Sequence, residues 1–214
     1  MTTNNSAGKP YYTQRNNAIR PSGACTVTAM IAALSAACWP VESLGTEKYP
    51  QPEDALMNYI LSDGAVAAAW KRLDPAQRFP PNEWHPLLEM GTNSWLEHAG
   101  LLRHGKKAAV WGEDRTLSDI ADCIRHGGAA VLSGTFAQGG KTIGHVVAAV
   151  GCNCSDGGEV ESLILDDSWG DYRDGYETAN GNDIEMPAAD FLRLIRQCGC
   201  RHKMAHLVQM FKEC

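Results

Sequence analysis

The sequence predicts an α+β protein in which helices come first along the chain and an antiparallel sheet comes second. Apolar residues at helical spacing dominate the first half, whereas short runs rich in β-branched residues occur in the second half. The 214 residues, 44% of them hydrophobic, suit one domain with a substantial core. We therefore expect a single domain over residues 11–214, preceded by a polar, disordered tail over residues 1–10.

Five segments are predicted to be helical, from apolar spacing and from residues that cap or end helices. They are residues 25–34, 52–61, 83–98, 117–125 and 190–196. Cys25 opens the first of them, directly after the turn residues Pro21-Ser22-Gly23. A cysteine in the first turn of a helix feels the positive end of the helix dipole, which lowers its pKa and increases the nucleophilic thiolate fraction. The alternative is a buried cysteine that only fills space.

Strands are predicted in the second half over residues 129–134, 146–151, 160–165 and 205–211. His145 stands at the start of the second of these strands, and Asp166 and Asp167 follow the third. If these two strands are antiparallel neighbours, the end of one lies beside the start of the other. The sequence therefore predicts that an aspartate lies next to His145, although turn formation alone is an alternative role for the two acids.

Three blocks of this sequence together resemble the bacteriocin-leader-peptidase-like (double-glycine-peptidase-like) cysteine peptidases. They are YYTQRNN with GACTVTAM at 11–17 and 23–30, GHVVAAVG at 144–151, and DSWGDY at 167–172. The resemblance covers residues 11–34 and 141–192 and leaves the middle of the chain unmatched. It implies a papain-like fold, in which an N-terminal helical part packs its nucleophile helix on a C-terminal antiparallel sheet.

By position, the resemblance implies four catalytic residues: Gln14 as oxyanion donor, Cys25 as nucleophile, His145 as base and Asp167 as its orienting group. Each residue type suits its task, because a thiol attacks, an imidazole removes the proton, a carboxylate orients the imidazole and an amide stabilises the oxyanion.

Two positions depart from the family pattern. Thr26 stands where many relatives have glycine, and Ser168 replaces the common proline after the aspartate. The second departure leaves Asp166 as the alternative orienting group. Trp169, two residues after Asp167, is predicted to contact the substrate.

The predicted function is amide-bond hydrolysis through a thioester, by an endopeptidase or amidase acting on peptidoglycan stem peptides. This mechanism needs no cofactor and no metal. The alternatives are a protein-processing peptidase, a transpeptidase, and a papain-fold module without catalysis that binds a peptide or a partner protein.

Charge and hydropathy exclude other classes of protein. The net charge is −6 and the basic residues are scattered, which argues against nucleic-acid binding. No stretch approaches the ~20 apolar residues of a membrane span, and the polar start has no apolar core for a signal peptide. We therefore expect synthesis in the cytoplasm, with export only by a dedicated secretion or lysis machinery. The oligomeric state is not predicted.

The eight cysteines support a separate hypothesis. The pairs Cys152/Cys154 and Cys198/Cys200, with His202 and His206 nearby, are candidates for a structural zinc site or for disulfides. Free thiols are the default interpretation, and a metal-stabilised binding protein is the corresponding functional alternative.

Overall fold

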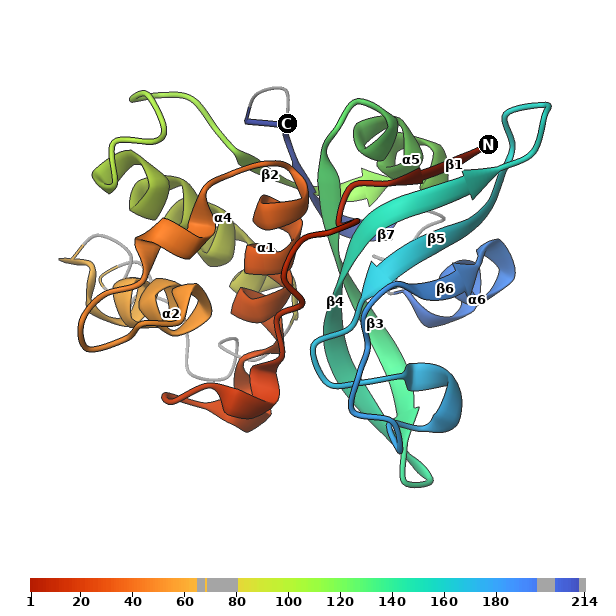
Figure 1. Ribbon diagram of the computed structural model, residues 1–214, viewed down its shortest axis with the longest axis horizontal. Helices are drawn as coiled ribbons and strands as arrows, with labels where there is room; N and C mark the ends of the chain where they lie inside the picture. Colours follow the sequence, from red (N-terminus) through yellow and green to blue (C-terminus); the bar gives the residue numbers. More distant parts are fainter. Residues whose placement is uncertain (65–67, 69–80, 196–202, 212–214) are drawn as a thin grey trace.

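The computed structural model describes residues 1–64, 68, 81–195 and 203–211. Within these residues a seven-stranded antiparallel sheet carries helices on both faces (Figure 1), which confirms the α+β class. The spatial order of the strands is β2 (Ala109–Arg115), β7 (Lys203–Val208), β3 (Ala129–Gln138), β4 (Lys141–Cys154), β5 (Val160–Asp166) and β6 (Ile184–Pro187). A further short strand, β1 (Thr2–Asn4), pairs with the end of β4.

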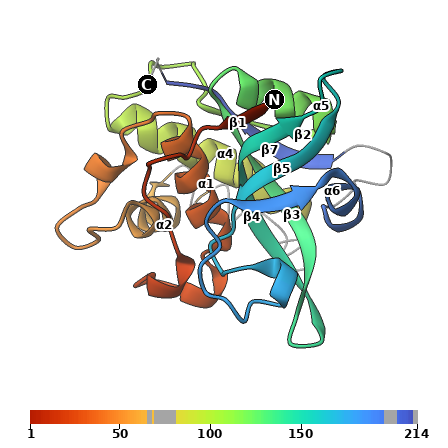
Figure 2. The same ribbon diagram turned by 45° about the vertical axis from the view of Figure 1, so that its right-hand side comes forward.

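The helices form two layers, one on each face of the sheet (Figures 1 and 2). The first layer consists of α1 (Cys25–Ala36), α2 (Pro52–Ser62) and α4 (Pro81–His98), and the second of α5 (Leu117–Arg125) and α6 (Ala188–Leu194). Four short 3₁₀ helices connect these elements: η1 (Gln14–Asn16), η2 (Pro21–Gly23), η3 (Val41–Leu44) and η4 (Tyr172–Asp174). Each predicted helix is present, with bounds shifted by a few residues.

Each face of the sheet has its own hydrophobic core, because side chains alternate between the faces along a strand. In β4, Val146 and Ala148 belong to the core beneath α1, whereas Val147 and Ala149 belong to the core beneath α5. All these side chains are buried, so β4 reads as a continuous apolar run rather than as an alternating one. Helix α1 is buried around almost its whole circumference, and its alanines let it lie close to β3 and β4.

Strand β4 is longer than the sequence indicates, and this changes the position of His145. The strand begins at Lys141, directly after a tight turn in which Gly139 and Gly140 both have positive φ angles of 54° and 76°. Two residues with positive φ form the turn that matches the twist of a hairpin. His145 therefore lies inside β4, opposite Gly134 of β3, and not at the start of the strand.

The first ten residues were expected to be a disordered tail, and the structure differs. Residues of β1 pair with β4 from Asn153 to Gly151, beyond the point where β3 stops pairing with it. The side chain of Asn5 donates hydrogen bonds of 2.8 Å each to the carbonyls of Ile124 and Gly128. From there the chain runs down between the helical layer and the sheet to η1 (Figure 1).

The cysteine pairs show no shared site within the described residues. Cys152 and Cys154 are free thiols on β4, and no group of three or more described His, Cys, Asp or Glu side chains could hold a metal ion. His206 instead contacts the ring of His85. Cys38, for which the sequence showed no pattern, is disulfide-bonded, and none of the free described cysteines is its partner. The remaining candidates, Cys198, Cys200 and His202, lie outside the described residues.

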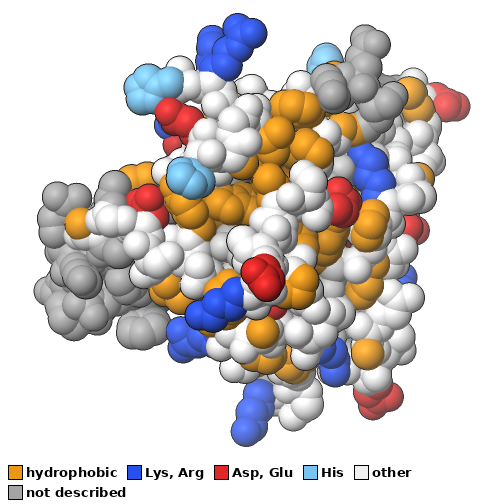
Figure 3. Space-filling view, turned by 60° about the vertical axis from the view of Figure 1, so that its left-hand side comes forward, with side chains coloured by type: hydrophobic (Ala, Val, Ile, Leu, Met, Phe, Trp, Pro, Cys, Tyr) orange, Lys and Arg blue, Asp and Glu red, His pale blue; other side chains and the backbone are white. Residues whose placement is uncertain are grey.

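The face that carries the first helical layer shows apolar side chains gathered near its centre, with acidic and basic side chains scattered around them (Figure 3). No single sign of charge dominates this view, as the scattered lysines and arginines of the sequence indicated. Among the described residues, no helix has both the length and the apolar character needed to cross a membrane.

Candidate active site

Cys25 is the first residue of α1, as the sequence predicts. The helix has no side-chain cap, because its N-cap residue is Ala24 and not one of the polar residues in η2. Its first backbone N–H groups are therefore free to stabilise negative charge on the thiol or on a bound oxyanion. Thr26, where the peptidases that the sequence resembles commonly have glycine, places its hydroxyl 3.9 Å from the Cys25 sulfur.

His145 and Asp167 form a buried pair beside the start of α1. The Nε2 atom of His145 lies 2.7 Å from Oδ1 of Asp167, and the two side chains are only 4% and 0% exposed. This contact leaves Nδ1 as the ring nitrogen available to Cys25. Strand β5 stops pairing with β4 opposite Ala148, so the stretch of β4 that includes His145 has a free edge on that side. The chain after β5 crosses this edge and brings Asp167 to the imidazole.

The thiol and the imidazole shift each other's protonation in opposite directions. Burial alone raises the pKa of Cys25. The net pKa is nevertheless below its usual value, because His145 lowers it through a hydrogen bond and through its charge, with smaller contributions from Thr26 and the Val146 backbone. Burial alone lowers the pKa of His145, but the charge and hydrogen bond of Asp167, together with Cys25, raise it. These opposite shifts favour a thiolate–imidazolium pair.

The loop that carries Asp167 is held by backbone contacts that leave no room for side chains. The Asp167 N–H donates to the carbonyl of Gly181 at 2.8 Å, and the hydroxyl of Tyr11 donates to the Asp167 carbonyl at 2.5 Å. A Cβ atom on Gly181 would lie 2.1 Å from the Asp167 carbonyl oxygen, and one on Gly170, whose φ is +139°, would lie 2.2 Å from that of Thr178. These two glycines therefore permit the close packing that fixes the carboxylate.

Asp166, the alternative orienting residue, has a different environment. Its Oδ1 accepts a hydrogen bond of 3.2 Å from the backbone N–H of Asp183, and it makes no described hydrogen bond to His145. Burial, opposed by that backbone hydrogen bond, raises the pKa of Asp166 to about 7, and the charge of Asp183 adds to the increase. Asp167 is thus the aspartate that contacts the imidazole.

Gln14 lies in η1 and is held against the Asp167 loop. Its Oε1 accepts a hydrogen bond of 2.8 Å from the hydroxyl of Ser168, and its Nε2 donates at 2.8 Å to the carbonyl of Pro21. The backbone N–H of Gln14 also donates to the Ser168 carbonyl at 3.0 Å. A carboxamide has two N–H donors, so one of them stays available after the Pro21 contact. Ser168, where the peptidases that the sequence resembles commonly have proline, therefore orients the predicted oxyanion donor.

Replacement of Gln14 by alanine is expected to lower turnover about a hundredfold, because one oxyanion donor typically contributes ~3 kcal/mol to transition-state stabilisation. Alkylation of Cys25 should stay nearly normal, since the thiolate does not depend on that donor. Ser168→Ala should lower turnover by a smaller factor, because it frees the amide to rotate without removing it. Parallel measurement of turnover and alkylation checks both variants. Equal loss of both quantities in Gln14→Ala would instead indicate that the loop had collapsed.

Trp169, the predicted substrate contact, is partly exposed beside this loop. The guanidinium of Arg15 lies 4.5 Å from the centre of its ring, and Arg15 Nε donates to the Trp169 carbonyl at 2.7 Å. The indole thus already has a cationic partner on one side. A role in substrate binding stays a prediction.

Two aromatic residues at the site were not identified from the sequence. Phe136 and Tyr176 place their rings 5.7 Å and 5.8 Å from that of His145, both nearly perpendicular to it. Tyr176 has a positive φ of 72°, which is uncommon for a bulky residue and is maintained at functional sites by surrounding contacts. The only sequence signal was its position after Gly175, in the stretch that resembles the peptidase family.

The hydroxyl of Tyr176 faces the second oxygen of the Asp167 carboxylate. Burial and the charge of Asp167 raise the pKa of Tyr176, so the hydroxyl stays protonated and is a donor. Asp167 Oδ2 and the Tyr176 hydroxyl oxygen are both buried without a conventional hydrogen-bond partner. A protonated hydroxyl beside an unpaired carboxylate oxygen is a suitable donor for it, so Tyr176 is a candidate to position Asp167.

No protein-family model matches this chain, and no curated protein matches it in sequence.

Proposed function

We propose that this protein is a cysteine hydrolase that cleaves amide bonds through a thioester intermediate. The observation that carries the proposal is the buried His145–Asp167 pair at 2.7 Å, next to a helix-start cysteine whose pKa is lowered by that histidine. A nucleophile beside a base that is itself held by an orienting group is the general signature of an activated nucleophile.

In the proposed reaction, the Cys25 thiolate attacks the amide carbonyl carbon and forms a tetrahedral oxyanion. The backbone N–H of Cys25 and the free N–H of Gln14 donate hydrogen bonds to that oxygen. The imidazolium of His145 then gives its proton to the leaving amine as the C–N bond breaks, which leaves an acyl-thioester on Cys25. Neutral His145 next removes a proton from water, which attacks the thioester and releases the acid.

The substrate class that we propose is the stem peptide of peptidoglycan, on the basis of the resemblance to compact peptidases that act on cell walls. A protein-processing peptidase uses the same catalytic groups, so the residues at the site do not distinguish the two. The papain-like fold is part of the same proposal, and the nucleophile helix α1 against strands β3 and β4 supports it.

Alkylation at mildly acidic pH tests the proposed ion pair. At about pH 5.5 only about one in a thousand ordinary thiols is ionised. We expect iodoacetamide to modify Cys25 quickly under these conditions. Cys123 and Cys152 serve as internal controls, because burial, together with other smaller contributions, raises the pKa of each to about 11. Peptide mass spectrometry measures modification at each position.

The matched variant for this test is His145→Ala, which removes the partner of the thiolate and keeps every cysteine. Modification of Cys25 should then fall to the level of the control cysteines. Slow modification of Cys25 in the unaltered protein, or equal rates with and without His145, would contradict the proposed pair.

A further inference from the structure

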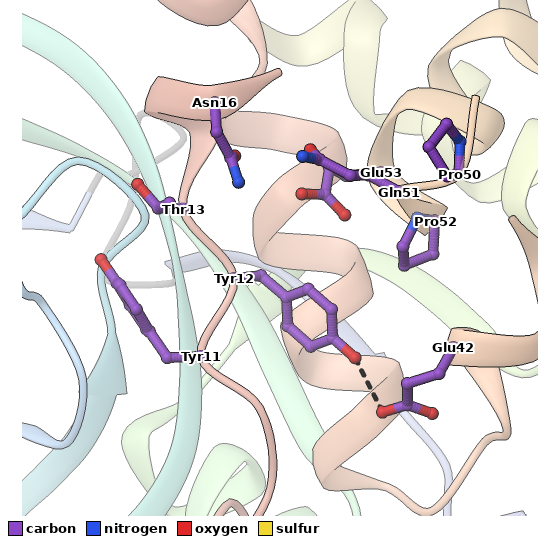
Figure 4. A pocket seen from close by; sticks show the side chains of 9 residues that line it. All are labelled: Tyr11, Tyr12, Thr13, Asn16, Glu42, Pro50, Gln51, Pro52 and Glu53. Atoms are coloured by element: carbon purple, nitrogen blue, oxygen red, sulfur yellow. Dashed lines mark hydrogen bonds between the residues drawn. The ribbon is translucent and has the colours of Figure 1, made fainter. Parts of the chain in front are cut away.

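A cavity lies outside the candidate active site (Figure 4). Its volume is about 280 Å³, and it lies between residues 11–16 and the first turn of α2. We call residues 11–16 the strap. Cys25, His145 and Asp167 do not line this cavity. One wall is the ring of Tyr12, whose hydroxyl donates a hydrogen bond of 2.8 Å to Glu42.

The cavity contains a buried carboxylate without a counter-charge. Glu53 is only 3% exposed, and its Oε2 atom has no hydrogen-bond partner. The Oε1 atom of Gln51, in the same wall, is also buried and unpaired. Both side chains reach from the start of α2 toward the strap (Figure 4). Two acceptor atoms beside the cavity, both shielded from solvent, therefore lack a donor in this structure.

The groups around Glu53 do not neutralise it. No lysine or arginine is among the described residues that line the cavity, and Glu42 adds negative charge from η3. Asp54, next in α2, is already engaged, because it accepts hydrogen bonds from the backbone N–H groups of Ala18 and Ile19. The ring of Tyr12 lines the cavity from the strap, whereas the Tyr11 side chain points away from Glu53 and donates to the Asp167 carbonyl (Figure 4). The pKa of each tyrosine is raised, so both are neutral. An unpaired buried carboxylate is costly unless it takes up a proton or a cation accompanies it.

We propose that this cavity binds a primary ammonium group at the end of a short alkyl chain or at the start of a peptide. An ammonium group offers three N–H donors and a positive charge, and thus satisfies Glu53 Oε2 and Gln51 Oε1 together. The adjoining ring of Tyr12 is a suitable surface for the alkyl part or for the cation. The volume of about 280 Å³ accommodates an aminoalkyl group.

The location connects this cavity to the catalytic site without depending on it. The strap that forms one wall also carries Gln14, whose side chain faces the Asp167 loop. An amine-bearing peptide held by Glu53 would therefore contact the segment that positions the oxyanion donor. Binding is a separate property from hydrolysis, so it can be measured on the Cys25→Ala protein.

Calorimetric titration at pH 7.5 with three small probes tests the proposal. Nα-acetyl-lysine amide carries a side-chain ammonium, alaninamide carries an α-ammonium, and Nα-acetyl-norleucine amide has the alkyl chain without a charge. We expect at least one of the two amines to bind and the norleucine compound not to bind. The amine that binds identifies whether the site accepts a lysine-type side chain or a free amino terminus.

The informative variant is Glu53→Gln, with Glu47→Gln as its matched control, since Glu47 is exposed and does not line the cavity. The first should weaken amine binding at least tenfold, and the second should leave it unchanged. Unliganded Glu53→Gln should unfold at the same or a higher temperature than the original protein, because it removes an unpaired buried charge.

A second measurement needs no substitution. Burial raises the pKa of Glu53 to about 7. The hydrogen bond from its own backbone N–H opposes this increase, and the charge of Asp54 adds slightly to it. The ionised form binds the amine, so affinity for the lysine probe should fall about tenfold per pH unit below 7 and level off above it. The proposal is overturned if neither amine binds, if norleucine binds equally well, if Glu53→Gln keeps full affinity, or if affinity does not change with pH.

Discussion

Replacement of Cys25 by alanine is expected to abolish amide hydrolysis and to leave the fold unchanged. The loss should exceed about 10⁴-fold, because removal of the nucleophile leaves only substrate binding and the oxyanion donors. The fold should persist, because Cys25 is only partly buried at the start of a helix whose other residues provide its packing. Release of soluble fragments from purified peptidoglycan, and of peptides from casein, measures the activity on the two candidate substrate classes.

Circular dichroism and thermal unfolding provide the control for this variant. An unchanged spectrum and transition, with hydrolysis lost, assigns the defect to chemistry. Unchanged turnover by Cys25→Ala in a preparation of demonstrated purity would remove Cys25 from the mechanism. Activity on casein but not on peptidoglycan would support the proposed mechanism and would show that the substrate is a protein and not a stem peptide.

Replacement of His145 by alanine is expected to be almost as damaging as loss of Cys25, because the two residues act as one unit. Asp167→Ala should cost less, about 10- to 1000-fold, since an orienting carboxylate contributes less than the base. Asp167→Asn should cost less again, because its amide oxygen still accepts the hydrogen bond from His145 Nε2. The ratio kcat/KM of each variant on a single peptide substrate measures these losses.

Asp166→Ala is the matched control for the carboxylate. Both aspartates are buried and adjacent, but Asp166 contacts the backbone of Asp183 and not the imidazole. Its replacement should change kcat/KM by only a few-fold. A larger loss in Asp166→Ala than in Asp167→Ala would reverse the assignment of the two residues.

The contacts of the candidate site could be predicted from the sequence because they depend on short-range patterns. The apolar run after Cys25 and the β-branched run after His145 each indicate an element without reference to the rest of the chain. Strands β4 and β5 pair in antiparallel fashion, as the sequence predicted, and this pairing brings Asp167 toward His145. The register, however, places the end of β5 opposite Ala148 and not opposite His145. The aspartate reaches the imidazole because the chain continues across the free edge of β4.

The elements that the sequence did not indicate depend on contacts made elsewhere in the fold. β1 consists of Thr2-Thr3-Asn4 and has no apolar pattern, and its strand conformation depends on the edge that β4 offers. The first residues of β4 are mostly polar, so the apolar pattern in the sequence did not indicate that the strand begins at Lys141. The glycine pair at 139–140 was the signal that could have shown it, because two such residues favour a hairpin turn.

The enclosure of His145 by Phe136 and Tyr176 has a consequence for the direction of proton transfer. Perpendicular rings on the imidazole and the hydrogen bond to Asp167 together prevent the ring from turning over. Each nitrogen therefore keeps the same neighbour throughout a catalytic cycle. In the proposed reaction, the leaving amine and later the incoming water would therefore both approach the base from the Cys25 side. The protein, and not the substrate, would thus set the direction from which the carbonyl is attacked.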